Sequence, residues 1–159
     1  ACDIRDRLIT IVNDDLEALT DASMAKLDPA QPLLERLIAL FEPRYHYWVL
    51  DPEISSVALT ETAARWLDDD DPSETARFLR RRLGLTAKIA ELVAAEQRAG
   101  GLGTPDDAPA IALFVMGVYL AHVRFWLGER HPQVAEGIAQ LRRQLHLALV
   151  GLLARNPPA

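Results

Sequence analysis

Apolar residues recur along most of this chain at the spacing of an α-helix. In residues 30–49 they form one continuous stripe, and residues 132–154 carry a second. The first stripe consists of Leu34, Leu37, Ile38, Phe41, Tyr45 and Trp48. No stretch alternates between apolar and polar residues with a period of two between turn signals. The pattern therefore predicts an all-α fold without strands.

Proline and glycine mark where these helices begin and end. Residues that precede proline tend to leave the helical conformation, whereas proline itself suits the first helical position. Five pairs fit this rule: Asp28-Pro29, Asp51-Pro52, Asp71-Pro72, Thr104-Pro105 and His131-Pro132. The glycines of 100–103 close the fourth helix, and Pro43 is expected to kink or break the second.

These signals predict about six helices in a single domain. The expected helices cover residues 2–27, 30–49, 52–68, 72–99, 105–128 and 132–154. Asp71 and Glu74 have the spacing of a capping box at the start of the fourth. The domain should span residues 1–155, followed by a frayed tail over 156–159.

The fifth helix is apolar on more sides than one domain interior can cover. At 100° per residue, Phe114, Val118, His122 and Phe125 share one face, and the opposite face carries Met116, Tyr119 and Val123. The last helix is similar, because Leu147, Val150 and Leu153 lie on the side that should be polar. Such surplus apolar surface predicts an interface.

A second copy of the chain is the most economical partner for that interface. Small residues at Gly117 and Ala121 would let another helix approach closely, in an isologous four-helix contact. The alternative is a monomer in which the long fourth helix covers the remaining face. The candidate dimer residues are Leu113, Gly117, Ala121, Arg124, Leu147 and Val150.

The aromatic residues suggest a binding pocket as well as a core. Each alone is more simply a core residue, but as a group they resemble the wall of a small-molecule pocket, with His122 as a polar partner. The candidate ligand-binding residues are Phe41, Tyr45, Trp48, Trp66, Phe114, Val118 and His122. A different rotation of the fifth helix would exchange the pocket and dimer sets.

Charge and composition exclude several functions. With a net charge of −6, the chain lacks the clustered excess of basic residues that binds nucleic acid, and Arg80 to Arg82 read as a solvated helix face. The single cysteine, Cys2, suits a cytoplasmic protein without disulfides. The apolar segment 111–127 contains Arg124 and is shorter than the roughly 20 residues that cross a bilayer, so no membrane span is expected.

Catalytic and metal-binding motifs are not found. The four histidines form no H-E-x-x-H or E-x-x-H pair, and Glu42 with His46 lacks a second pair. The sequence contains no G-x-S-x-G, P-loop or G-x-G-x-x-G motif. We therefore expect no enzyme activity, no metal and no cofactor.

Several segments resemble the C-terminal regulatory domain of TetR-type transcriptional repressors. Residues 77–130 combine a long amphipathic helix ending in Glu96-Gln97-Arg98-Ala99-Gly100 with a glycine turn and an apolar helix opened by Thr104-Pro105-Asp106-Asp107. Residues 33–54 and the final helix at 134–153 are similar to the corresponding parts of such domains. The resemblance covers nearly the whole chain.

This resemblance implies a cytoplasmic, ligand-responsive regulator. Such domains are irregular, orthogonal helical bundles that bind a small, here mostly apolar, effector between their helices and dimerise through their last two helices. Operator DNA is bound only through an N-terminal helix-turn-helix, which is absent from this chain and is expected in the intact protein. The alternative is a headless helical binding or interaction protein with no role on DNA.

Overall fold

The computed structural model describes residues 4–64, 74–104 and 106–150, with side chains for 7–60, 84–104 and 106–150. Six helices form this part of the chain, and it contains no strand. They are α1 (Ile4–Lys26), α2 (Leu33–Trp48), α3 (Pro52–Ala64), α4 (Glu74–Arg98), α5 (Ala108–Leu127) and α6 (Val134–Val150). The predicted all-α fold is confirmed.

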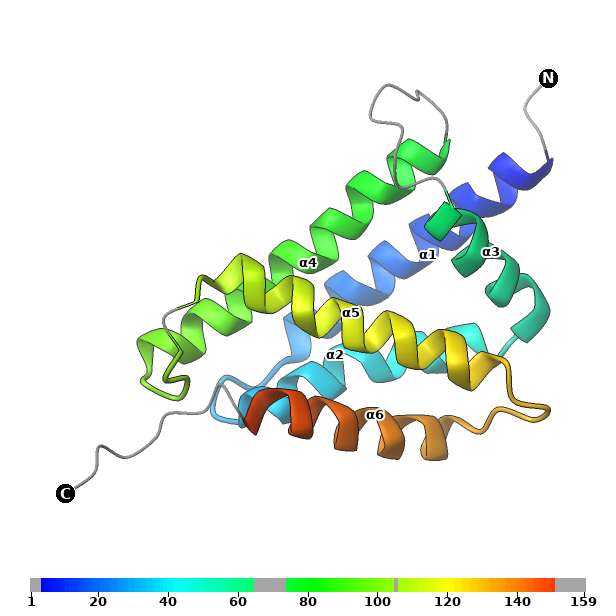
Figure 1. The fold of residues 1–159 in the computed structure, drawn as a ribbon. Helices are drawn as coiled ribbons and strands as arrows, with labels where there is room; N and C mark the ends of the chain where they lie inside the picture. The colour runs from blue at the N-terminus through cyan, green and yellow to red at the C-terminus, as the bar shows by residue number, and fades with distance from the viewer. Residues whose placement is uncertain (1–3, 65–73, 105, 151–159) are drawn as a thin grey trace.

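Helix α5 lies at the centre of the bundle. Helices α1 and α4 run side by side, α5 crosses in front of them, and α2 packs along α6 (Figure 1). Helix α5 packs on α3, α4 and α6, and one continuous hydrophobic core joins α1, α2, α4, α5 and α6. The side chains of α5 therefore meet those of several other helices.

The observed helix starts coincide with the predicted X-Pro pairs only where no stronger N-cap residue lies nearby. Helix α3 begins at Pro52 as predicted, and the Asp51 carboxylate accepts the Ile54 N–H at 3.0 Å. Helix α5 begins at Ala108 rather than at 105, because Asp107 is the cap and accepts the Ala110 N–H at 2.8 Å. At both helices the first carboxylate able to reach a free N–H sets the boundary.

The second helix starts later than predicted and is not broken. It begins at Leu33 rather than at 30, because the Asp28 carboxylate instead accepts the Ala30 N–H in a separate turn. Helix α2 then runs through Pro43, and the predicted break is wrong. Buried residues on both sides of Pro43, including Phe41 and Arg44, hold the two halves against the core.

Glycine ends α4 as predicted. Gly100 has a φ of +77°, a left-handed conformation that favours glycine. The N–H groups of Gly100 and Gly101 donate to the carbonyl oxygens of Gln97 and Glu96, both at 3.0 Å, which closes the last turn. The expected cap at Asp71, the ends of the third and last predicted helices, and the C-terminal tail lie outside the described residues.

The apolar segment of 111–127 belongs to a helix longer than the segment itself. Helix α5 spans 20 residues and contains an 18-residue window with a mean hydropathy of 1.7, so by length and composition alone it meets the requirement for a membrane span that the segment 111–127 did not meet. Half of that window is buried inside the bundle. Packing against α3, α4 and α6 therefore accounts for the apolar character of that half.

Candidate functional site: a buried aromatic and polar cluster

The side chains of α5 divide cleanly into a buried and an exposed arc. The buried residues are Ile111, Ala112, Val115, Met116, Tyr119, His122, Val123, Trp126 and Leu127. The exposed residues from Leu113 onward, which we call the exposed arc, are Leu113, Phe114, Gly117, Ala121, Arg124 and Phe125. At 100° per residue the exposed arc covers about one third of the helix circumference, and Arg124 is its one charged member.

Aromatic rings from α2 and α5 fill the interior where these two helices meet. The Phe41 ring stacks on Tyr119, with centroids 4.3 Å apart and an angle of 8° between the planes. The Tyr45 ring lies against Trp126, with centroids 4.7 Å apart. These four side chains and Trp48 are at most 1% exposed, so the aromatic cluster is a filled core rather than an open pocket.

The phenol oxygen of Tyr119 is the polar centre of this cluster. It accepts hydrogen bonds from Trp48 Nε1 at 2.9 Å and from Arg44 Nε at 3.1 Å. Arg44 Nη1 in turn donates to Thr20 Oγ1 at 2.9 Å and to the Leu16 carbonyl oxygen at 3.4 Å. This network ties α1, α2 and α5 together.

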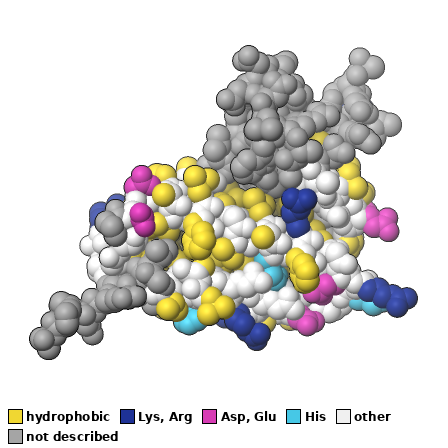
Figure 2. Space-filling model, viewed as in Figure 1, with side chains coloured by type: hydrophobic (Ala, Val, Ile, Leu, Met, Phe, Trp, Pro, Cys, Tyr) yellow, Lys and Arg dark blue, Asp and Glu magenta, His cyan; other side chains and the backbone are white. Residues whose placement is uncertain are grey.

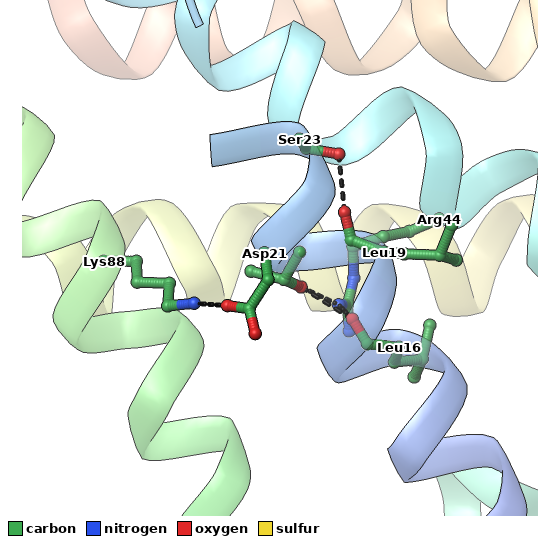
Figure 3. Close-up of polar contacts among 7 residues, drawn as sticks. Leu16, Leu19, Asp21, Ser23, Arg44 and Lys88 are labelled. Carbon is green, nitrogen blue, oxygen red and sulfur yellow. Dashed lines mark hydrogen bonds and ion pairs between the residues drawn. The ribbon is translucent and has the colours of Figure 1, made fainter. Parts of the chain in front are cut away.

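Arg44 carries a buried positive charge that no carboxylate of the described residues neutralises. Its side chain reaches from α2 to the inner side of α1 near Leu16 and Leu19 (Figure 3). It is only 7% exposed, and its acceptors are a phenol, a hydroxyl and a carbonyl. Among the described residues no acidic side chain forms an ion pair with it. Arg36, which is similarly buried, is paired with Glu96.

His122 belongs to a second polar chain through the same core. Its Nδ1 lies 2.5 Å from the Tyr45 hydroxyl, and its Nε2 lies 3.2 Å from Gln140 Oε1. Because the Gln140 oxygen only accepts, Nε2 carries the hydrogen and Nδ1 accepts from Tyr45. Burial lowers the pKa of His122 against smaller opposing effects of Gln140 and Glu129, and burial raises the pKa of Tyr45. Both side chains are therefore neutral near pH 7.

The structure brings together four of the seven candidate pocket residues: Phe41, Tyr45, Trp48 and His122. Val118 is half-buried at the edge of the core, and Trp66 lies outside the described residues. Phe114 is 52% exposed and lies on the exposed arc, so its assignment to the pocket is corrected.

Sequence reasoning missed Tyr119 and Arg44. Tyr119 was placed on the face opposite His122, although Tyr119, His122 and Trp126 follow one another at intervals of three and four residues. That spacing is a detectable signal for a shared helix face. The burial of Arg44 leaves no such signal, because arginine in an amphipathic helix is usually exposed.

All six candidate dimer residues are exposed. Leu113 and Leu147 are 58% and 70% exposed, and Val150 is exposed at the end of α6. A Cβ atom added to Gly117 would meet nothing within 4 Å. Figure 2 shows hydrophobic side chains gathered over α5 and beside α6. Helix α4 packs on α5 but leaves these six residues exposed, so within the described part of the chain α4 does not cover this face.

Within the described residues no three His, Cys, Asp or Glu side chains come together as a metal site. The chemistry that this site offers is hydrogen bonding, one buried cation and aromatic contact.

No family model, curated protein or solved structure matches the chain.

Proposed function

We propose that this chain is the ligand-binding and dimerisation domain of a small-molecule-responsive transcriptional regulator of the TetR type. The division of α5 into two arcs is the observation that supports this function best. One arc enters a core that contains a buried arginine without a carboxylate partner among the described residues, and the other exposes apolar side chains to solvent. A single helix therefore serves both a ligand site and an interface.

In this proposal the exposed face of α5 and α6 is the contact between two copies of the chain. Leu113, Phe114 and Phe125 of α5 are exposed, and so are Leu147 and Val150 of α6, a helix that packs on α5. Exposed apolar side chains on two packed helices are typical of an interface, and two copies related by a twofold axis would cover them with four helices. Phe114, originally assigned to the pocket, joins this interface.

A ligand would act on the dimer through α5. A molecule that changes how Tyr119 and Arg44 pack would shift α5, and the interface lies on the other side of the same helix. Such a ligand shifts the dimer between two arrangements only if it binds one of them more tightly. In the intact protein that shift would change the spacing of two N-terminal DNA-binding domains. The domain itself acts by binding and not by catalysis.

The decisive experiment is to sequence the reading frame upstream of the codon for Ala1. We expect it to encode a basic helix-turn-helix that continues directly into α1. The full-length protein should then shift a DNA fragment from its own promoter region on a native gel. A start codon immediately before this segment would overturn the regulator proposal, and the headless binding or interaction protein would take its place.

A further inference from the structure

A cavity of about 120 Å³, which we call the Glu96 cavity, lies between α2, α4 and α6. The start of α2 and the ends of α4 and α6, which line it, are at the same end of the bundle (Figure 1). Glu96 and the exposed His146 are its two polar lining residues. Five apolar residues form the rest of its wall: Pro32, Leu33, Leu34, Leu102 and Leu149.

The volume of the Glu96 cavity sets the size of a ligand. An engineered apolar cavity of roughly 150 Å³ is large enough to bind benzene. At about 120 Å³ and not fully enclosed, the Glu96 cavity therefore matches a single ring or a short alkyl chain. None of its lining residues takes part in the ring contacts of the aromatic cluster or in the hydrogen bonds of Tyr119, so it is separate from that filled core.

The Glu96 carboxylate has one oxygen that the described residues do not use. Its Oε2 accepts from Arg36 Nη2 in an ion pair that joins α2 to α4. Arginine and carboxylate often pair through two N–H groups and two oxygens. Here Arg36 Nε is instead fully enclosed without a partner, and Glu96 Oε1 makes no hydrogen bond with a described residue. The same ion pair therefore leaves one donor and one acceptor unpaired.

Gly101 makes room for that free oxygen. A Cβ atom added to Gly101 would lie 1.9 Å from Glu96 Oε1, so a side chain at this position would displace the carboxylate. Oε1 thus lies against the backbone of Gly101, and the next residue, Leu102, lines the cavity together with Glu96. Because the Glu96 side chain is only 23% exposed, a donor that reaches Oε1 from the cavity forms a partly buried, charge-assisted hydrogen bond.

We infer that the Glu96 cavity binds a neutral molecule of about the size of benzene that carries one hydroxyl group, such as a phenol. The ring contacts the apolar wall, and the hydroxyl group donates to Glu96 Oε1. A neutral donor suits this oxygen better than a cation, because Arg36 already balances the charge of Glu96. The inference does not rest on the proposed function, since no lining residue belongs to the candidate dimer or ligand-binding residues.

The test compares two ligands of equal size. Phenol and toluene differ only by a hydroxyl in place of a methyl group, so their affinities separate the hydrogen bond from the apolar contact. We would titrate each into the ¹⁵N-labelled chain at pH 7.5 and follow the backbone amide signals by NMR. Phenol should bind about tenfold more tightly than toluene, because its hydroxyl donates to a charged acceptor. It should also shift the signals of Leu102 and Leu149.

Three results of these titrations would overturn the inference. The first is equal affinity for phenol and toluene, and the second is failure of phenol to bind at millimolar concentration. The third is tighter binding of benzylamine, which is a cation at pH 7.5, than of phenol. The reading frame upstream of Ala1 would still decide the regulator proposal in each case.

Glu96→Gln tests the hydrogen bond itself. Arg36 only donates, so the amide oxygen of the glutamine takes the place of Oε2, and the amide NH₂ group takes the place of Oε1. Phenol then exchanges a charge-assisted hydrogen bond for a neutral one, and its preference over toluene should fall several-fold. A folded Glu96→Gln variant that keeps the full preference would contradict the role of Oε1.

Leu34→Phe tests the location and leaves the pair of Arg36 and Glu96 intact, so it is decisive if Glu96→Gln unfolds. Leu34 is half-buried in the cavity wall, and the larger side chain should fill part of the space and weaken phenol binding several-fold. Leu50→Phe makes the same change at an exposed residue outside the cavity and should bind phenol like wild type. Unchanged binding in Leu34→Phe, or a loss only in Leu50→Phe, would place the phenol elsewhere and overturn the inference.

Discussion

At the scale of single residues, Tyr119 has the largest polar role in the core. Its oxygen is the shared acceptor of an indole N–H and a guanidinium N–H, and no other described side chain replaces it. Tyr45, by contrast, donates one hydrogen bond to a neutral histidine. Two tyrosines that are equally buried therefore differ in how many partners depend on them.

This difference predicts unequal effects of removing the two hydroxyls. Tyr119→Phe leaves the N–H groups of Trp48 and Arg44 without an acceptor, one of them charged, and should cost about 2–4 kcal/mol of unfolding free energy. Tyr45→Phe leaves only the His122 Nδ1 acceptor unpaired and should cost about 1–2 kcal/mol. Urea unfolding of both variants measures the difference. A smaller loss for Tyr119→Phe would contradict the network described here.

The buried His122 predicts a loss of stability at acidic pH. Burial lowers its pKa in the folded state, so the unfolded chain, with an ordinary value near 6.5, binds the proton more readily. The contribution of His122 to the free energy of unfolding is thus constant above about pH 6.5. It becomes increasingly unfavourable to the folded state as the pH falls toward the lowered folded pKa. Tyr45, Gln140 and Glu129 are the groups that face it or act on its charge.

Urea midpoints between pH 8 and pH 5 would measure this effect. His122→Gln should flatten the decline below pH 6.5, whereas His131→Gln, an exposed control, should retain the wild-type profile. Equal profiles for wild type and His122→Gln would show that carboxylates alone cause the decline.

The sequence predicted the aromatic members of the site better than the polar ones. Phe41, Tyr45 and Trp48 follow an apolar stripe on α2, so helical spacing was sufficient to place them together. Arg44 lies between them and is buried only because Tyr119 and Thr20 reach it from two other helices. Such a contact depends on tertiary structure and leaves no periodic signal in α2 alone.

At the scale of the elements, the rotation of α5 is what the sequence left undecided. Both sides of this helix are apolar, and hydrophobicity alone therefore does not say which side faces inward. The buried arc contains Tyr119, His122 and Trp126, whose polar atoms find partners on α2, α6 and the turn before α6. Hydrogen bonding therefore determines which side of α5 faces inward, because the pattern of apolar residues is similar on both sides.

Two glycines on neighbouring helices allow a matched test of this packing. A Cβ atom at Gly137 of α6 would lie 2.7 Å from Trp126 Nε1 and 2.8 Å from Cε2, and the buried indole has no room to move. Gly137→Ala should therefore destabilise the chain by about 1–3 kcal/mol despite its better helix propensity. Gly117→Ala meets no atom and should stabilise the isolated chain by up to about 1 kcal/mol.

Urea unfolding at low protein concentration would compare the two variants. Trp126 fluorescence should also change in Gly137→Ala, because its N–H donates to the Gln133 carbonyl at 3.1 Å. A Gly137→Ala variant as stable as wild type would mean that α6 lies farther from Trp126. In a dimer with α5 at its centre, Gly117→Ala should in addition weaken self-association.

At the scale of the whole molecule, the sequence predicted the fold class and the exposed face but not the state of the core. Helical periodicity fixed six helices, and surplus apolar surface on the last two indicated an uncovered face. Whether the aromatics line a pocket or fill a core depends on how closely α2 and α5 approach. The ring contacts between them show a filled core.

The uncovered face predicts that stability depends on protein concentration. If two copies bury the exposed arc of α5 with Leu147 and Val150 of α6, unfolding is coupled to dissociation, and the melting temperature rises with concentration. Leu147→Asp places a charge in this contact and should give a melting temperature independent of concentration. Leu50, which is 80% exposed in the turn after α2, belongs to neither the exposed arc of α5 nor α6, so Leu50→Asp should behave like wild type.

Sedimentation velocity on the same three proteins would give the oligomeric state directly. Wild type and Leu50→Asp should sediment as dimers at tens of micromolar, and Leu147→Asp as a monomer. A monomeric wild-type chain with a constant melting temperature would rule out the homodimer. The apolar face would then require a different partner, because a solvated surface of Leu113, Phe125 and Leu147 otherwise leaves this hydrophobic area in water.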